Sequence, residues 1–334
     1  MVRFAAHLLP QMPVDQCVRI GKMCEDAGFD MLFIADEAPG FPFRDPFIVW
    51  AQIFAMTKKI KIGTGITNPY TRHPAMIANV LATLDEAAPG RVMLGISAGG
   101  SVPLVPTGNF PARKPIAAVR EGIEVIRRLL AGETVDFKGE VIRCNKARVI
   151  GPPKQKIPIY MAARRPMMLR LLGEIADGGL IDVTPWALSK IEEGARKANR
   201  SLTDIDIGSS LEIKVVRDDV ERRKAIEDRK YSLTFRIPDT PIEQLEGRVT
   251  AEEQTMIANA LRTSGVPAAL PLITDEIVDK FAVIGTPEEV ISKSRKRMIE
   301  GVNFYYLSMP PGPDPQFAFK ALGEQILPAL GSVR

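Results

Sequence analysis

The sequence predicts an α/β fold, a (β/α)8 TIM barrel with insertions, from three observations. Short apolar runs bounded by glycine alternate with longer segments whose apolar residues recur at helical spacing. This alternation repeats eight times in 334 residues, which fits a barrel of about 250 residues that carries additional segments. No Gly-, Ser- or Pro-rich linker divides the chain, so we expect a single domain over residues 1–334.

Eight short apolar runs are the expected barrel strands, because each is bounded by turn residues. They lie at Arg3–Leu9, Asp30–Ala35, Ile60–Ile66, Arg91–Ser97, Ile157–Ala162, Gly179–Val183, Asp206–Val215 and Asn303–Ser308. The segments between and after them are expected to be helices, since their apolar residues fall on one helical face and several begin with proline. These span Val14–Ala27, Pro46–Thr57, Pro74–Ala87, Ile116–Ala131, Pro166–Ala176, Ala187–Ala198, Thr286–Glu300 and Pro315–Leu327.

Two segments exceed the strand and helix repeat. Residues Thr134–Pro153 contain two alternating runs around a Lys-Gly turn, which predicts a small hairpin before the fifth strand. Polar helical patterns run from about Glu221 to Lys280 and are interrupted at Pro238–Pro241. They predict a helical insertion near the barrel mouth, before the eighth strand.

The charge balance and the apolar runs bear on partners and location. The chain has 44 basic and 40 acidic residues, a net charge of +4, which is too small an excess to suggest nucleic acid but is compatible with an anionic small ligand. Residues Met1–Met12 lack the long apolar core of a signal peptide, and no run reaches the length of a membrane span. We therefore expect a cytoplasmic protein with no membrane partner.

Cysteine and histidine are too few and too scattered for a disulfide framework or a metal site. Cys17, Cys24 and Cys144 form no CxxC pair, so we expect reduced thiols. His7 and His73 are the only histidines, which excludes a histidine-rich metal site. His73 precedes a proline at a helix start and is interpreted as a cap or surface contact. No P-loop, HExxH or GxSxG motif occurs, so phosphoryl transfer and metal-dependent hydrolysis are not indicated.

The ends of the predicted strands carry the residues suited to ligand binding. In parallel α/β folds ligands bind at the carboxyl ends of the strands, and here the chain places Gly63–Pro69 and Ser97–Gly100. Small residues at these points let backbone N–H groups approach a planar or anionic ligand closely. The segment Gly63–Gly65 is not a Rossmann fingerprint, because Asn68-Pro69 follows it rather than a helix.

Two further features face the expected mouth. Asp36 follows an apolar strand, so its carboxylate either faces the mouth or caps the next helix. The loop Ala162–Arg165 precedes a helix that Pro166 opens, and free N–H groups at such a helix start suit a phosphate. Its two arginines either strengthen anion binding or are solvated surface charges.

Ordered segments along the whole chain resemble one family. They are IADE, IGTGITNP, ATLDEAAPGRVMLGIS, KPIAAVREGIEVIRRLLAGE, IPIYMAARRPMMLRLLGEIADGGLI and FAVIGTPEEV. On these segments the chain is similar to the bacterial-luciferase-like barrel superfamily, and within it to the branch that depends on the deazaflavin coenzyme F420. The methylenetetrahydromethanopterin reductases are the most similar group in that branch.

This resemblance implies the residues that line the cofactor site. They are Asp36, Thr64, Gly65, Ile66, Thr67, Asn68, Ser97, Ala98, Gly99, Ala162, Ala163, Arg164 and Arg165. In the family the third strand ends in a cis peptide bond that is not to proline, and the matching bond here is Gly65-Ile66. Asp36 would contact the polar edge of the deazaflavin and Ala163–Arg165 its phosphate. The alternatives are an ordinary bulge at the barrel end for Gly65 and tight strand-to-helix turns for Ser97–Gly99.

The acid-base residues that the resemblance implies are not all present. His7 stands where the look-alike reductases have a carboxylate at the end of the first strand, and Gly100 stands where they have an acidic residue after the fourth. Glu37 occupies the position of a histidine in the related sugar-phosphate dehydrogenases. Glu37 and His7 are therefore the candidate catalytic residues. Histidine is suited to proton exchange near neutral pH, whereas Glu37 would need burial to raise its pKa.

Three classes of function follow. The first is an F420-dependent oxidoreductase that transfers a hydride between the deazaflavin and a small organic substrate. The second is an FMN-dependent monooxygenase or reductase on the same barrel, and the third is a non-catalytic relative that keeps the binding pocket.

We also expect a homodimer or higher homo-oligomer, for which the apolar helices Pro46–Thr57 and Pro74–Ala87 offer a two-fold interface.

Overall fold

A parallel barrel forms the centre of the molecule. The computed structural model describes residues 2–100, 104–245 and 247–332. Eight strands pair in parallel in the order β3-β2-β1-β12-β9-β8-β7-β4, and bridges Ile62↔Val92 and Thr67↔Ile96 join β3 to β4. The barrel strands are β1 (Arg3–Leu8), β2 (Met31–Ile34), β3 (Lys61–Thr64), β4 (Leu94–Ile96), β7 (Ile159–Ala162), β8 (Gly178–Ile181), β9 (Asp206–Ser210) and β12 (Phe304–Met309). Each of the eight predicted strands contributes a strand to the barrel.

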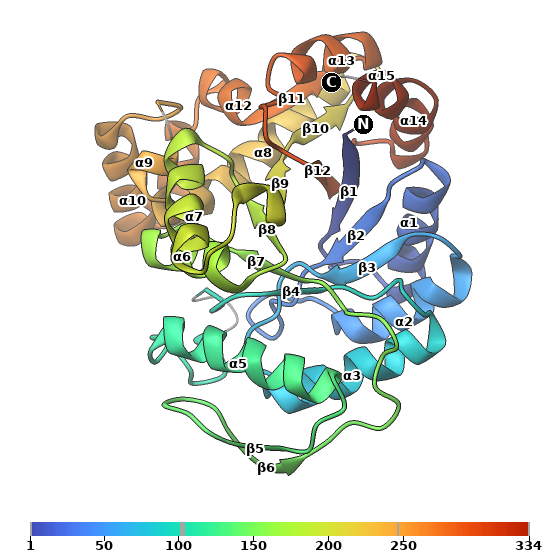
Figure 1. Cartoon of the computed structure of the whole chain (residues 1–334). Coiled ribbons are helices and arrows are strands. Elements are labelled where there is room, and N and C mark those ends of the chain that lie inside the picture. The colour runs from blue at the N-terminus through green and yellow to red at the C-terminus, as the bar shows by residue number, and fades with distance from the viewer. Residues whose placement is uncertain (1, 101–103, 246, 333–334) are drawn as a thin grey trace.

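The helices surround this barrel (Figure 1). They are α1 (Val14–Asp26), α2 (Pro46–Met56), α3 (Pro74–Ala87), α5 (Pro115–Leu130), α6 (Pro166–Ile175), α7 (Pro185–Lys197), α13 (Pro287–Arg295), α14 (Pro315–Ala321) and α15 (Leu327–Gly331), with short turns η1 (Leu202–Asp204) and η3 (Leu322–Ile326). Several start as expected from proline at the first helical position and a capping side chain: Asp45 accepts from Phe47 N, and Thr184 from Ala187 N.

Two predicted helix ends are wrong. The helix expected to reach Glu300 stops at Arg295, and the last helix continues through a π turn to Gly331 instead of ending at Leu327. Helix ends carry unsatisfied backbone groups whose partners come from tertiary contacts, which periodicity alone does not report.

None of the described helices is both long enough and apolar enough to traverse a bilayer.

The predicted seventh strand is two strands in the structure. It breaks at Leu211, because β10 (Glu212–Val215) leaves the barrel and pairs in parallel with β11 (Ala282–Gly285). We did not predict β11, a four-residue apolar run that directly follows a helix. The pair lies beside α8 and α13 in Figure 1.

Both predicted extra segments are confirmed. The hairpin consists of β5 (Val135–Lys138) and β6 (Arg143–Ala147), and the Glu121 carboxylate of α5 accepts three backbone N–H groups of its turn. The insertion contains α8 (Asp219–Asp239), α9 (Ile242–Leu245), α10 (Ala251–Ser264), α11 (Val266–Ala269), η2 (Leu270–Leu272) and α12 (Asp275–Phe281). Thirteen buried apolar residues of these helices and of β10–β11 and their flanks form a separate cluster.

The barrel interior is filled by alternate residues of the strands. Three rings fill its centre: Tyr160 meets Phe33 and Phe304 edge to face, with ring centroids 5.6 and 5.9 Å apart. Phe33 and Phe304 lie nearly parallel to each other, with centroids 6.3 Å apart. Gly208 leaves room for these three rings, because a Cβ there would lie 2.1 Å from Phe304 Cζ. Side chains that point into the barrel recur at every second residue of a strand. The inward residue two positions after each of these central residues therefore faces the mouth.

Candidate active site

The floor of the mouth is apolar. Phe33 and Leu180 are buried in the inner barrel cluster, and Ile66, Ala162 and Tyr306 pack against it half-buried. These residues come from five different strand ends, so they form a continuous surface across the barrel. Two of the predicted cofactor-lining residues, Ile66 and Ala162, therefore meet on this floor.

The loops after β3 and β4 are joined by backbone and side-chain bonds. Thr64 Oγ1 donates to the carbonyl of Gly95 at 2.6 Å, and Ser97 N donates to the carbonyl of Thr67 at 3.1 Å. Gly99 has a φ of +74°, and a Cβ there would lie 3.3 Å from the Asn68 side chain. The structure thus brings together two of the segments that the resemblance assigned to the cofactor, Thr64–Asn68 and Ser97–Gly99.

The peptide bond Gly65-Ile66 is cis, as the resemblance implied. Gly65 is required here, since a Cβ would lie 2.7 Å from Phe33 Cβ and 2.9 Å from His7 Cδ2. The close approach of these neighbours excludes any larger residue at position 65.

Asp36 is bonded to the protein itself. Its carboxylate, 3% exposed, accepts from Thr67 Oγ1 at 2.7 Å and from Arg72 Nε and Nη2 at 2.7 and 3.1 Å. Arg72 also contacts Asp45 at 2.7 Å. Burial lowers the pKa of Arg72, but its bonds to the two carboxylates outweigh burial and raise that pKa overall. The alternative that Asp36 caps the next helix is wrong, because Asp45 caps α2.

The loop after β7 presents backbone donors and two exposed arginines. Helix α6 begins at Pro166 with Arg165 as its N-cap residue and without a side-chain cap, so its first N–H groups are available to a ligand. Arg164 is ion-paired with Asp239 at the end of α8, at 2.9 Å. This pair ties the predicted phosphate loop to the helical insertion.

The two candidate proton carriers differ in their contacts. His7 Nε2 lies 2.7 Å from the carbonyl oxygen of Gly65. Glu37 is half-buried, and no described residue bonds its carboxyl group. Burial raises the pKa of Glu37, and the positive charge of Arg164 offsets this only in part. At Gly100 none of the described residues, its chain neighbours aside, lies within 4 Å of an added Cβ.

Charged residues that we did not predict line the side of the mouth under α8. Asp182 follows β8 and pairs with Arg236 at 2.5 Å. Glu212 opens β10, accepts from Ser308 Oγ at 2.8 Å, and lies 3.7 Å from Arg229. Both carboxylates occupy inward positions two residues beyond Leu180 and Ser210. Because side chains on one face of a strand recur at every second residue, counting two residues past each strand end would have identified both carboxylates from the sequence.

These carboxylates are ionised in the folded protein. Burial raises the pKa of Asp182, but Arg236, Arg164 and Arg248 lower it to about 2. Burial likewise opposes ionisation of Glu212, while Arg229 and Lys214 lower its pKa to about 2. Neither group can supply a proton near neutral pH, which leaves Glu37 as the carboxyl in the mouth with a raised pKa.

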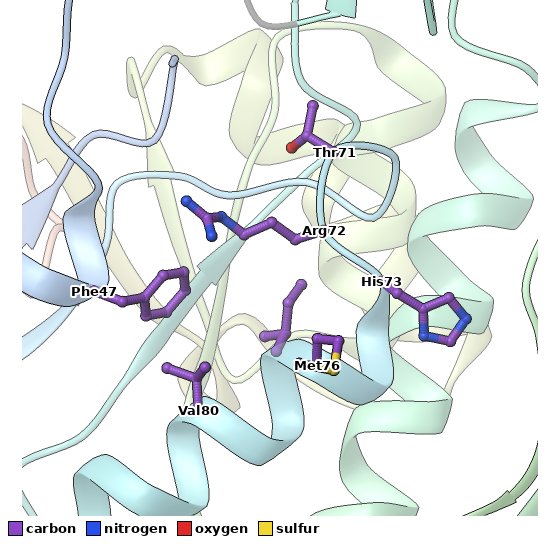
Figure 2. Close-up of a pocket in the computed structure, with 7 residues that line it drawn as sticks. Phe47, Thr71, Arg72, His73, Met76 and Val80 are labelled. Atoms are coloured by element: carbon purple, nitrogen blue, oxygen red, sulfur yellow. The ribbon is translucent and has the colours of Figure 1, made fainter. Parts of the chain in front are cut away.

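A pocket of about 260 Å³ lies outside the mouth, between α2 and α3. In Figure 2 the Arg72 side chain extends over Phe47, its guanidinium carbon 4.9 Å from the ring centroid, while His73 points away. His73 Nδ1 accepts from Ala75 N, which confirms the predicted cap. Met76 closes one side and is 60% exposed.

No group of three or more His, Cys, Asp or Glu side chains arranged to hold a metal occurs among the residues that the structure describes. Cys17, Cys24 and Cys144 are free cysteines in this structure. The described part of the mouth is thus an apolar floor with backbone donors on one side and charged pairs on the other.

The chain is similar to proteins of known activity over nearly its whole length. The family model for luciferase-like monooxygenases matches residues 1–302. A 5,10-methylenetetrahydromethanopterin reductase of Methanopyrus kandleri is 33% identical over 348 residues, covering 98% of this chain and 98% of the relative. An F420-dependent glucose-6-phosphate dehydrogenase of Nakamurella multipartita is 30% identical, covering 92% and 89%. The solved coenzyme F420 dependent tetrahydromethanopterin reductase from Methanopyrus kandleri matches with a TM-score of 0.85 at 32% identity, over 98% and 99% of the two chains.

Proposed function

The chain belongs to the family of luciferase-like monooxygenases, and on that premise we propose that it is a coenzyme F420-dependent oxidoreductase. It transfers a hydride between the deazaflavin and a small organic substrate. Two relatives named as F420-dependent enzymes match it at 30 and 32% identity, over 92 and 98% of the chain. The observation that carries the assignment to the site is the uncapped start of α6 beside Arg164 and Arg165, which suits the phosphate of such a cofactor.

The residues present fit this cofactor. The ring would lie on the apolar floor against Gly65 and Ile66, with Ser97–Gly99 beside it and the phosphate at Ala163–Arg165. When bound, F420 supplies a carrier that accepts or donates a hydride. Asp36 fixes Thr67 and Arg72, and we infer that it shapes the cofactor loop besides any contact it makes to the ring.

The protein's own part in the reaction is to orient the substrate and to move one proton. When the substrate is reduced, hydride addition leaves one substrate atom negatively charged, and this atom takes a proton from the Glu37 carboxyl group. Solvent at the mouth then protonates the Glu37 carboxylate again. The raised pKa of Glu37, caused mainly by burial, keeps it protonated to higher pH than an exposed glutamate. In the oxidative direction the same carboxylate accepts the proton.

The substrate differs from that of the methylenetetrahydromethanopterin reductases, or the proton supply has been rebuilt. His7 and Gly100 stand where the resemblance implies carboxylates, and glycine cannot exchange a proton. A substrate protonated from the β2 side, where Glu37 lies, agrees with the residues present. Small ketones, aldehydes and imines are the chemical classes that take up a hydride and a proton together.

We further infer that the protein forms a homodimer through α2 and α3. The exposed side chains of α2 carry no charge: Ile48, Ala51, Gln52, Ala55 and Met56. Ile48, Met56 and Met76 are 59, 57 and 60% exposed. A surface of this composition is unusual for a helix that faces only water, and a two-fold axis would cover it with its own copy.

Turnover with the reduced cofactor tests the proposed function. Reduced F420 is mixed with the protein and a panel of ketones, aldehydes, imines and methylenetetrahydromethanopterin, and the absorbance of the oxidised cofactor is followed. We expect oxidation with at least one of these electrophiles and none with reduced FMN. Substrate-dependent oxygen uptake with reduced FMN would instead support the monooxygenase alternative, and F420 binding without any turnover would support a non-catalytic relative.

A further inference from the structure

His7 contacts the backbone of the neighbouring strand end. Its Nε2 lies 2.7 Å from the carbonyl oxygen of Gly65, and a carbonyl oxygen can only accept a hydrogen bond. Nε2 therefore carries the proton, and the ring donates to the end of β3. We propose that His7 is a positioning residue, whose Nε2–H holds the Gly65 carbonyl and so fixes the strand end on which the cofactor ring packs. This inference rests on the proposed function for the identity of that cofactor.

The imidazole packs against two neighbours. An ideal Cβ at Gly65 would lie 2.9 Å from its Cδ2, so the ring lies close to the Gly65 backbone. The Tyr306 ring meets the imidazole edge to face, with centroids 6.4 Å apart. Tyr306 donates its hydroxyl to the carbonyl of Ile181 instead, so it does not compete for the imidazole. This packing leaves the ring little freedom to swing toward a substrate.

A carboxylate at this position could not make the same bond. An ionised carboxylate offers only acceptors, and it would face the Gly65 carbonyl oxygen with like charge. The titratable groups that face His7 are Tyr306 on β12 and Glu212 at the start of β10. Burial lowers the pKa of His7, while the bond to Gly65 and the charge of Glu212 raise it less. The neutral ring with its proton on Nε2 is thus the form that this site holds.

Three substitutions at position 7 test the donor role through F420 affinity. His7→Gln keeps an N–H donor, His7→Leu removes it, and His7→Glu donates only when protonated. Each Kd is divided by that of the wild type at the same pH. We expect His7→Gln to bind within about 3-fold of the wild type and His7→Leu to bind about 10-fold more weakly, since the half-buried Gly65 carbonyl loses its partner. His7→Glu should be as weak as His7→Leu at pH 8 and recover toward pH 5.

His73→Leu is the matched control. His73 also contacts a backbone carbonyl through Nε2, that of Arg143 at 2.9 Å, but on the outside of the barrel. Its substitution should leave the Kd for F420 unchanged. Equal F420 affinity of folded His7→Leu and wild type would overturn the positioning role, whereas a wild type that does not bind F420 at all would reject the proposed function.

A measurement without cofactor tests the Nε2–H bond of His7 whether or not the protein binds F420. The chain has two histidines, so the His73→Gln variant leaves His7 as the only imidazole in a ¹⁵N correlation spectrum. We expect a neutral ring protonated at Nε2 from pH 6 to 8. A ring protonated at Nδ1, or one that gains charge with an ordinary histidine pKa, would contradict the bond to Gly65. Loss of turnover in His7→Gln by 10²-fold or more at unchanged F420 affinity would make His7 the proton carrier instead.

Discussion

At the scale of single residues, the mouth holds carboxyl groups with opposite protonation. Arginines on α8 and on the loop after β7 keep Asp182 and Glu212 ionised, with pKa values of about 2, while burial raises the pKa of Glu37. Neighbouring acids whose environments separate their pKa values commonly divide the acidic and electrostatic roles of an active site. Here the separation of pKa values makes Glu37 the carboxyl group that we propose donates the proton to the substrate.

Replacing Glu37 by Gln should lower turnover by about 10²–10⁴-fold if Glu37 is the general acid, with F420 affinity nearly intact. The wild-type rate of reduction should fall as pH rises through the raised pKa of Glu37, because only the protonated carboxyl donates. That pH limb should vanish in Glu37→Gln. Steady-state rates across pH measure both effects. Exposed Glu300 is a matched control, and Glu300→Gln should change neither. Unchanged turnover in Glu37→Gln would remove its assigned role.

The pair Arg236–Asp182, whose side chains are 18% and 11% exposed, should be sensitive to loss of one partner. Arg236→Met leaves the half-buried Asp182 carboxylate without its nearest cation, which we expect to cost up to about 3 kcal/mol. Adding Asp182→Asn removes that charge and should recover part of the loss. Urea unfolding of the single and double variants measures both changes. An additive double variant would show that the two side chains do not stabilise each other.

The same carboxylate predicts a pH dependence of stability. The pKa of Asp182 falls from 3.8 to about 2 on folding, so its contribution is present above pH 3.8 and is lost as pH falls toward 2. The magnitude is on the order of 2 kcal/mol. Asp182→Asn should therefore show a flatter decline of unfolding free energy across this range than the wild type. An equally steep decline would mean that other carboxylates cause the acid sensitivity.

At the scale of elements, helices α6 and α7 depend on two glycines where their backbones touch. A Cβ at Gly194 would lie 1.9 Å from the carbonyl oxygen of Arg170, and one at Gly173 would lie 2.0 Å from that of Ile191. Backbone atoms cannot yield as a flexible side chain can. The spacing of these two helices is therefore fixed by residues that contribute no side chain.

Gly194→Ala should destabilise the fold by about 2 kcal/mol or more, because the helices must separate to admit the methyl group. Thermal unfolding of the variant measures this. Gly100→Ala is the control, since no described residue other than its chain neighbours lies within 4 Å of an added Cβ, and it should change the midpoint little. A Gly194→Ala variant as stable as the wild type would show that the helix contact is looser than described.

The sequence could predict those elements whose own pattern decides them. Pro74–Ala87 is bounded as predicted, because proline begins it and its periodicity is strong. The residues of β10 were predicted as part of the seventh strand, but the break at Leu211 and the strand β11 were missed. The break follows from a partner strand more than 60 residues away. The same holds for the site. The cis bond at Gly65-Ile66 followed from the resemblance, whereas the partners of Asp182 and Glu212 lie on α8, which no local pattern connects to the barrel.

At the scale of the whole molecule, the uncharged exposed face of α2, together with exposed Met76 of α3, predicts self-association. We expect a dimer at micromolar concentration, and Ile48→Lys should shift it toward monomer, since a buried cation opposes apolar contact. Met256→Lys is the matched control, because Met256 is also exposed, at 49%, but lies on the insertion. Sedimentation or light scattering measures the mass. A monomeric wild type would contradict this interface.

The central claim is that the mouth of this barrel binds the deazaflavin cofactor, and a paired titration tests it most directly. The protein is titrated with F420 and separately with FMN under identical conditions, with binding followed by the fluorescence of each cofactor. We predict saturable binding of one F420 per chain with a lower Kd than that for FMN, weakened by replacement of Arg165 beside the α6 N-terminus. Tighter binding of FMN than of F420 would contradict the account.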